Sequence, residues 1–425
     1  MVGVVGLPLF DQIKIVSAPV SGAVSFLGNG HLRYCHIFPT LPNCHITELP
    51  NCGIVLTLQL MKILTDITDP VSVRKPANRM DRFFVSLLRD ERDLPFVYLT
   101  LKITATLLPL AVLLFIPGIN PWIWWVAAIA YQYFNNVAFK GPYGLMMHCT
   151  SHRAWFKQEY SLLNFYLPWV IGPFFGQTPE TYYAHHVGMH HPENNMPDDE
   201  SSTMKFQRDS LKDFTVYVGT FLFMGIYHLC SYFVRKQRKR LLFRSVRGEL
   251  LFIVMCVALC FVNWPATLVV FILPFFTFRI IAMTGNWAQH AFIAPDDPEN
   301  CYKNSVTCIN TKYNVKCWND GYHISHHLES TMHWTEHPVY FRQTLNEYIV
   351  NDAVVFDGIH FLHVFIYLAR GRYDLLAKHF VNLGDRYKTD EEVMAFLKAR
   401  TKKIDVAPYF VSGRYENVEK RAELA

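Results

Sequence analysis

Histidine is the residue type whose spacing in this sequence most clearly indicates chemistry. Twelve of the nineteen histidines fall within two windows, residues 148–191 and 290–337. Ten of these twelve lie in three short motifs, HCTSH, HHVGMHH and HISHH, and in a fourth motif, GNWAQH, where an asparagine precedes a histidine by four residues. Neutral imidazole binds iron, copper, nickel and zinc alike. The pattern therefore predicts a metal site without choosing the metal.

The spacing within the motifs suits helices. Residues three or four positions apart lie on one face of a helix, close enough for two imidazoles to reach one ion. Each motif is therefore expected to direct a pair of imidazoles at a metal. Nine histidines are too many for one tetrahedral zinc, which takes four ligands, but they suit two metal ions. The candidate ligands are His148, His152, His186, His190, His191, His290, His323, His326 and His327.

Three further histidines in the same windows are expected either to support the metal ligands from outside or to be structural. His185 would point about 100° away from His186 on a helix, and His333 and His337 lie in a segment without other candidate ligands. Metal-bound imidazoles usually donate their second N–H to a carboxylate or carbonyl. Acidic residues near the motifs that could accept this bond, or could simply be solvated, are Glu180, Asp199, Asp320 and Glu329. The scattered histidines are interpreted as surface or capped residues: His31, His36, His45, His228, His360, His363 and His379.

The composition indicates a membrane protein. Hydrophobic residues make up 51% of the 425 residues and charged residues 18%, against roughly a quarter charged in soluble domains. Apolar runs that approach the roughly 20 residues needed to cross a bilayer occupy residues 96–117, 121–139, 214–234 and 241–284. The last run has room for two crossings, with a turn near Asn263 and Pro265, and Pro117 to Pro121 forms a turn between the first two.

Basic residues set the orientation. They cluster before the first apolar run and again at residues 235–247, and such clusters usually mark the cytoplasmic side. If both clusters are cytoplasmic, residues 214–234 cannot cross, so this stretch and residues 161–176 are expected to lie in the interface. The prediction is an all-α integral membrane protein with about four transmembrane helices in two hairpins, interfacial helices, and a cytoplasmic domain that holds the histidines.

The order HxxxH, HxxxHH, NxxxH, HxxHH, with membrane runs between, resembles the membrane fatty acid desaturase and alkane hydroxylase superfamily over roughly residues 80–345. The resemblance implies a cytoplasmic diiron site with the nine histidines as ligands and dioxygen as co-substrate. It also implies that Asn286 reaches a metal through water, as an asparagine does in stearoyl-CoA-type desaturases.

Within the superfamily the reaction stays open. The second motif has the spacing of alkane hydroxylases, whereas NDGYHISHHLESTMHWTEHP resembles the branch that includes alkene-forming fatty acid decarboxylases. Desaturation of a fatty acyl or related lipid chain is the leading hypothesis, and hydroxylation or decarboxylation is the alternative. A membrane metal transporter and an inactive regulator of lipid metabolism are alternatives of another class. Histidines outside the apolar runs argue against transport.

The remaining expectations concern partners and organisation. No HPGG motif of a fused cytochrome b5 domain, no nucleotide fingerprint and no iron–sulfur cysteine pattern is found, so the electron donor is expected to be a separate cytochrome b5-like protein or ferredoxin. No nucleic-acid partner is expected. The ten cysteines are expected to be reduced, and the location is the endoplasmic reticulum if the source is eukaryotic. Three regions are predicted: a leader or disordered region at 1–60, a desaturase-like membrane domain at 61–345 and a cytoplasmic helical region at 346–425.

Overall fold

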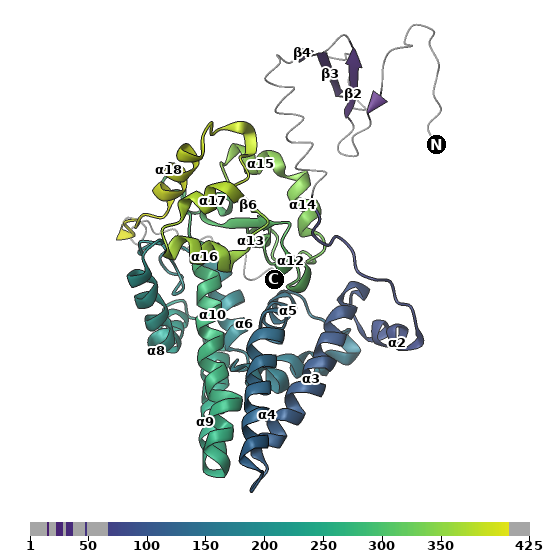
Figure 1. Ribbon diagram of the computed structural model, residues 1–425, viewed down its shortest axis with the longest axis vertical. Coiled ribbons are helices and arrows are strands. Elements are labelled where there is room, and N and C mark those ends of the chain that lie inside the picture. The colour runs from purple at the N-terminus through teal and green to yellow at the C-terminus, as the bar shows by residue number, and fades with distance from the viewer. Residues whose placement is uncertain (1–14, 17–22, 29–30, 37–46, 49–66, 408–425) are drawn as a thin grey trace.

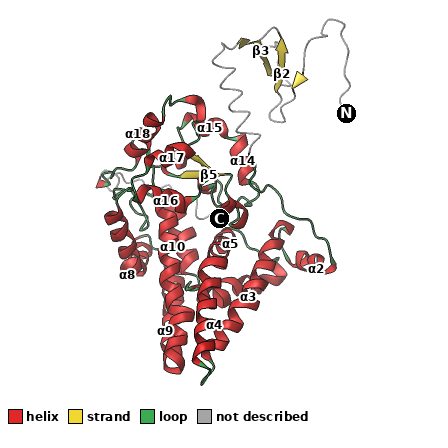
Figure 2. Ribbon diagram, in the orientation of Figure 1, coloured by secondary structure: helices red, strands yellow, loops and turns green. Residues whose placement is uncertain are grey.

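The computed structural model describes residues 15–16, 23–28, 31–36, 47–48 and 67–407. This part of the chain is mostly helical, with a few short strands (Figure 2). Long helices extend to one end of the molecule, and shorter helices gather around their opposite end (Figure 1). The predicted leader lies largely outside the described residues. Its described parts are four antiparallel strands: β1 (Ile15–Val16), β2 (Ala23–Gly28), β3 (His31–His36) and β4 (Thr47–Glu48).

The first helical hairpin is formed by α3 (Leu94–Phe115) and α4 (Pro121–Tyr133). Asn120 caps α4 by accepting a hydrogen bond from the Trp122 amide, and Pro121 occupies the first helical position, where its missing N–H costs nothing. The Trp124 indole donates to the Leu114 carbonyl across the turn at 3.0 Å. The second arm continues through a π-helical turn (Phe134–Phe139) into α5 (Lys140–His152).

The second hairpin is formed by α9 (Lys239–Thr267), a π-helical turn (Leu268–Ile272) and α10 (Leu273–Gln289). The chain reverses at Asn263, whose backbone is extended (φ −159°, ψ 91°). Across the two arms, Glu249 and Arg279 form a 2.8 Å ion pair. Asn263 Nδ2 also donates to the Leu114 carbonyl at 3.3 Å, so the tips of the two hairpins meet at the same end of the molecule.

Within the part of the chain that the structure describes, three helical stretches are long and apolar enough to cross a membrane: residues 91–115, 211–235 and 239–289. The last contains the reversal at Asn263 and has 51 residues. Large apolar side chains on the hairpins point outward, including Trp122 at 80% exposure and Phe261 at 89%. An apolar exterior of this kind is expected of a surface that faces lipid.

Helix α8 (Leu211–Arg235) lies beside α10 and stops short of the hairpin tips (Figure 1). Near its start, Phe214 packs on Trp287 with ring centroids 5.5 Å apart. Beyond its end, Lys236 forms an ion pair at 3.3 Å with Glu193, which lies two residues after the last histidine of the second motif. Both ends of α8 therefore contact the part of the molecule that contains the histidines.

Two strands interrupt the helices of the C-terminal part, which the sequence had been expected to build from helices alone. Strand β5 (Val306–Ile309) pairs in parallel with β6 (Val354–Asp357). Both are short apolar runs rich in β-branched residues and almost wholly buried, as parallel strands usually are. Because β6 pairs with β5, the region after residue 345 shares a core with the segment before it.

Short helices complete the described chain around these strands and the histidine motifs. Thr389 caps the last of them, because its side chain accepts from the Glu392 amide. They are α2 (Arg79–Leu87), α6 (Thr181–His185), α7 (His191–Glu193), α11 (Cys301–Asn304), α12 (Lys312–Lys316), α13 (His323–Leu328), α14 (His337–Gln343), α15 (Leu345–Val350), α16 (Phe361–Ala369), α17 (Tyr373–His379) and α18 (Asp390–Arg400).

Arg208 connects three distant segments through main-chain hydrogen bonds. Its side chain is buried, and its guanidinium donates to the carbonyls of Ala291 at 3.0 Å, Met204 at 3.0 Å and Arg400 at 3.0 Å. These carbonyls belong to the segment after α10, the segment after the second histidine motif and the end of α18. A planar cation with five donors suits this arrangement, and a lysine would satisfy fewer of the carbonyls.

Replacing Arg208 by Met should destabilise the protein by about 3 kcal/mol or more, because several buried carbonyls lose their donor. Thermal unfolding of the detergent-purified protein measures this. The exposed Arg372, which pairs with Asp374 on the surface, supplies the control: Arg372→Met should change the melting temperature little. Equal melting temperatures for the two variants would contradict the role given to Arg208.

Candidate metal site

Four segments bring the histidines together at the end of the hairpins opposite their tips. The first motif lies on the last turns of α5, and the third forms α13. The second starts at the end of α6, continues through a π-helical turn (His186–His190) and ends in α7. His290 follows the last residue of α10. Two of the segments, the end of α5 and the residue after α10, thus continue the arms of the long hairpins, which fixes their positions.

The nine candidate ligands form two groups, in each of which one nitrogen per residue lies within 4.8 Å of all the others. In the first group, the Nε2 atoms of His148 and His326 are 2.7 Å apart, and those of His191 and His326 are 2.9 Å apart. In the second group, His323 Nε2 lies 3.1 Å from both His290 Nε2 and His327 Nε2. The first group is His148, His152, His186, His191 and His326, and the second is His190, His290, His323 and His327.

The expected pairing holds for two motifs and is wrong for the second. His148 and His152 share a group, as do His323 and His327, each pair four residues apart. In the second motif, however, His186 pairs with His191, with the two Nε2 atoms 3.1 Å apart, while His190 belongs to the other group. The reason is the π-helical turn, whose i to i+5 hydrogen bonds bring residues five apart onto one face.

In two imidazoles of the second group, a hydrogen bond at Nδ1 leaves Nε2 to face the other histidines. His290 Nδ1 lies 2.9 Å from the Asn304 carbonyl, so Nδ1 carries the proton and Nε2 presents a lone pair. His190 Nδ1 lies 2.7 Å from Asp199. Partners of this kind orient metal-binding imidazoles and make them more basic.

Of the four acidic residues considered from the sequence, two lie next to candidate ligands. Asp199 contacts His190, and Asp320 lies 3.7 Å from His148 Nδ1. Glu180 instead pairs with Arg247, and within the described residues Glu329 forms no hydrogen bond or ion pair with a histidine. The Asn304 carbonyl was not foreseen, because a main-chain acceptor leaves no signal in the sequence.

Burial lowers the pKa of eight of the nine candidate imidazoles and so favours their neutral form. It lowers the pKa of His152 to about 4 and that of His290 to about 3, with neighbouring histidines adding to the effect. The pKa values of His186, His191 and His326 lie well below the usual value for the same reasons. A neutral imidazole is the form that binds a metal, so at neutral pH the site is ready for a cation.

The residues fit bound metal ions. His152 Nε2 is buried without a hydrogen-bond partner, although it lies within the first group. Buried polar atoms are rarely left unpaired, and several lone pairs that face one another repel unless a cation lies between them. An ion in each group would satisfy these nitrogens.

The other candidates take different positions. Asn286 Nδ2 donates to the Ser201 carbonyl at 2.9 Å and to the Tyr217 hydroxyl at 2.7 Å, so a contact with metal is left to its oxygen. His185, His333 and His337 belong to neither group. His333 Nε2 lies 3.1 Å from Asp93, and His337 Nδ1 lies 2.9 Å from the Ser325 hydroxyl.

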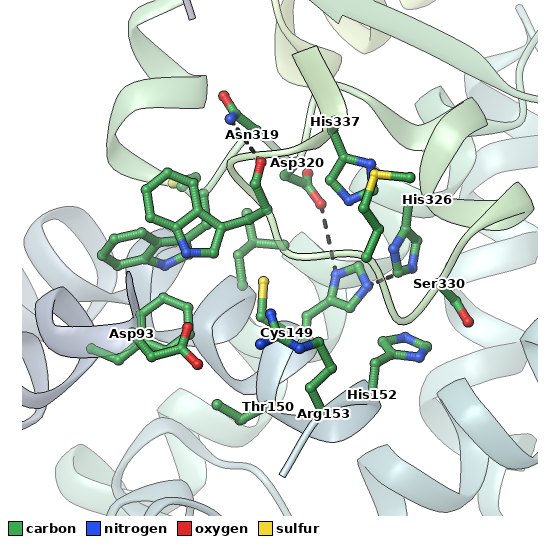
Figure 3. Close-up of a pocket in the computed structure, with 17 residues that line it drawn as sticks. Asp93, Cys149, Thr150, His152, Arg153, Asn319, Asp320, His326, Ser330 and His337 are labelled. Carbon is green, nitrogen blue, oxygen red and sulfur yellow. Dashed lines mark hydrogen bonds and ion pairs between the residues drawn. The ribbon is translucent and has the colours of Figure 1, made fainter. Parts of the chain in front are cut away.

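Cavities reach the histidines from two sides. One pocket lies between α5 and the segment of α13 and α14, where His152 and Arg153 lie across from His326 and His337 (Figure 3). A second, with a volume of about 150 Å³, lies between α5 and α10 and is lined by His148 and His186 of the first group and His190 and His323 of the second. The second cavity therefore gives one molecule access to both groups.

Comparison with known proteins adds the decisive observation. The model of the fatty acid desaturase family matches residues 124–355, which is more than half of the chain and contains all nine candidate ligands. The chain belongs to the fatty acid desaturase family. No curated protein and no solved structure matched. Membership in this desaturase family implies an oxidoreductase.

Removing a ligand should remove metal from this desaturase-family protein. His326→Ala is expected to empty mainly the first group, and His323→Ala or His327→Ala the second, because each loses a direct metal bond. Metal content per chain, determined by elemental analysis of the purified variants, is the measurement. His185→Ala, His333→Ala and His337→Ala are the matched controls and should retain most of the metal, with Asn286→Ala falling between. Complete metal loss in any of the three controls would show that the nine-ligand assignment is wrong.

Proposed function

We propose that the protein is a dioxygen-dependent oxidoreductase with two iron ions that acts on the hydrocarbon chain of a fatty acyl or related lipid. The observation that carries the proposal is the pair of adjacent histidine groups, five imidazoles and four, at the inner end of two apolar hairpins. Iron bound there would supply the oxidising power needed to remove hydrogen from an unactivated methylene. The ligands are the nine histidines, and Asn286 acts on the second ion through water.

The polypeptide orients and protects this centre. Asp199 and the Asn304 carbonyl hold His190 and His290 with Nε2 facing inward. Burial of the rings excludes water, which favours neutral imidazoles and limits side reactions.

A lipid chain as substrate is supported by the cavity between α5 and α10. Its walls include Phe278, Ile281 and Met283 of α10, and it opens on both histidine groups. On α5, Gly144 leaves room beside Phe278, since a Cβ there would lie 3.2 Å from that ring. This apolar part of the cavity wall would pack against a methylene chain. Desaturation is the reaction we favour, and hydroxylation or decarboxylation of the same chain is the alternative.

Lipid analysis tests the reaction class. Mass spectrometry of lipids from a host that expresses the protein should show a new double bond that is absent from a host that expresses His326→Ala. A new hydroxyl group or terminal alkene would assign one of the alternatives instead. Identical lipid profiles, with iron present in the purified wild-type protein, would contradict oxidation of a lipid chain.

We further propose that the two hairpins cross the membrane four times and that the histidine groups and both termini are cytoplasmic. The contact between the hairpin tips supports a shared side for both turns. The contacts at both ends of α8 support an interfacial position for that helix, although its length and composition would allow a crossing.

Cysteine labelling tests this topology. A cysteine that replaces the exposed Gln237 should react with a membrane-impermeant reagent from the cytoplasmic side only, because the loop after α8 is expected there. A cysteine at the exposed Pro117, in a hairpin turn, is the control and should react only from the opposite side. Labelling of both positions from the same side would mean that α8 crosses the membrane.

The electron donor is proposed to be a separate acidic carrier, such as a cytochrome b5-like protein or a ferredoxin. Reduction of dioxygen to water takes four electrons, and desaturation supplies two. The basic segment 235–247 lies against the second histidine motif, because Arg238 donates to the Gly188 carbonyl at 2.7 Å. Exposed cations on this segment, Lys239 and Arg240 among them, would attract such a carrier close to the histidines.

Reversing Lys239 and Arg240 to Glu should slow reduction at limiting donor by about 10-fold and flatten its salt dependence, because electrostatic steering acts on the association rate. Arg238 is left unchanged because it donates to the Gly188 carbonyl of the second histidine motif. Stopped-flow reduction across a salt series is the measurement, with Lys398→Glu and Lys402→Glu on α18 and its exposed end as a charge-matched control. If both double variants reduce like wild type, the donor docks elsewhere.

A further inference from the structure

Lys140 is a buried lysine, and burial lowers the pKa of its ammonium to about 7. It is the first residue of α5, only 2% exposed, and its ammonium donates to the Thr277 hydroxyl of α10 at 2.5 Å. Among the described residues no carboxylate forms an ion pair with it. Burying an ammonium costs several kcal/mol unless an opposite charge compensates. Such a lysine signals an anion that the polypeptide does not supply.

The ammonium belongs to the cavity that opens on both histidine groups. Lys140 lines this cavity together with His148, His190 and apolar residues of α10. The carboxylate that also lines it, Asp320, is directed at His148 and accepts from the Gln289 amide at 3.4 Å. An anion that entered the cavity would therefore find Lys140 available.

A purely structural role does not account for the charge. Thr277 accepts from Lys140 and donates to Asn136 at 2.9 Å, and Asn136 in turn donates to Gln132 at 2.6 Å. A neutral amide at position 140 could maintain this chain of hydrogen bonds without the desolvation of a charge. A cavity that bound only the methylenes of an acyl chain would have an apolar wall throughout. It would not need a lysine, because a methylene gains nothing beside an ammonium.

The position of Lys140 sets the distance to the metal site. Eight residues separate it from His148 on the same helix, which corresponds to about 12 Å along the axis. An extended chain of single bonds, such as a hydrocarbon chain, covers roughly 3.6 Å in three bonds. A group bound at Lys140 would thus lie roughly ten bonds from the carbon that faces the histidines.

We propose that Lys140 binds the carboxylate of a free fatty acid, so that the substrate enters the α5–α10 cavity as an acid and presents a mid-chain carbon to the two histidine groups. The inference rests on the proposed function and narrows its substrate to unesterified acids. Binding at Lys140 also argues against decarboxylation as the reaction, because the carboxylate is then held away from the metal site.

Binding of acids and of their methyl esters tests the proposal. The purified wild-type holoprotein in nanodiscs should bind lauric, palmitic or stearic acid at least about 10-fold more tightly than the matched methyl ester, because only the acid pairs with the ammonium. Lys140→Gln keeps an amide that can donate to Thr277 and should abolish this preference by weakening acid binding alone. Lys140→Arg should retain it, and Lys102→Gln, a change at an exposed lysine of α3, should bind as wild type does.

The outcomes separate this inference from the proposed function. Iron content and oxidised products are measured on the same samples. Two irons and oxidised lipid, together with equal binding of acids and esters by the wild type, would overturn the role of Lys140 and leave the oxidoreductase proposal standing. Absence of iron together with a clear preference for acids would overturn the oxidoreductase proposal and leave the role of Lys140 standing. If Lys140→Gln still bound acids more tightly than methyl esters, the carboxylate would bind elsewhere and the proposal would be wrong.

Discussion

The mutual approach of nine imidazoles is the constraint on which the rest of the structure depends. Nitrogen lone pairs within about 3 Å of one another repel, and burial deprives them of water, so the folded chain holds this arrangement only through strong support around it. That support comes from the ends of α5 and α10, from the π-helical turn of the second motif, and from hydrogen bonds such as that between His190 and Asp199. Cations between the lone pairs would turn the repulsion into attraction, which is why we regard metal binding as part of the fold.

The two hairpins position the histidine segments. Two of the four histidine segments follow directly from long apolar helices, and Arg208 ties the segment after α10 to the chain that follows the second motif. The same helices enclose the cavity between α5 and α10, so one packing arrangement positions both the candidate ligands and the cavity proposed for the substrate. The pairing of β5 with β6 then closes the structure on the side of α13.

Much of this architecture follows from local sequence signals, and the exceptions have physical causes. The hairpin turns were predictable from Asn120, Pro121 and Asn263, and the pairs His148/His152 and His323/His327 from helical spacing. The division of His186 and His190 between the two groups was not, because a π-helical turn differs from an α-helix by one hydrogen-bond step that tertiary packing selects. Strands β5 and β6 were missed because four buried apolar residues do not distinguish a strand from a helix. Lys140 was overlooked because a single lysine after an apolar run is usually a boundary residue, and only the folded chain places it in a cavity.

The most direct test of the account is the location of the metal. Anomalous scattering recorded above and below the iron absorption edge from crystals of the purified protein would show where iron lies. The account predicts two peaks, one among His148, His152, His186, His191 and His326 and the other among His190, His290, His323 and His327. A single peak, or anomalous signal at the zinc edge alone, would contradict a diiron centre built from these nine histidines.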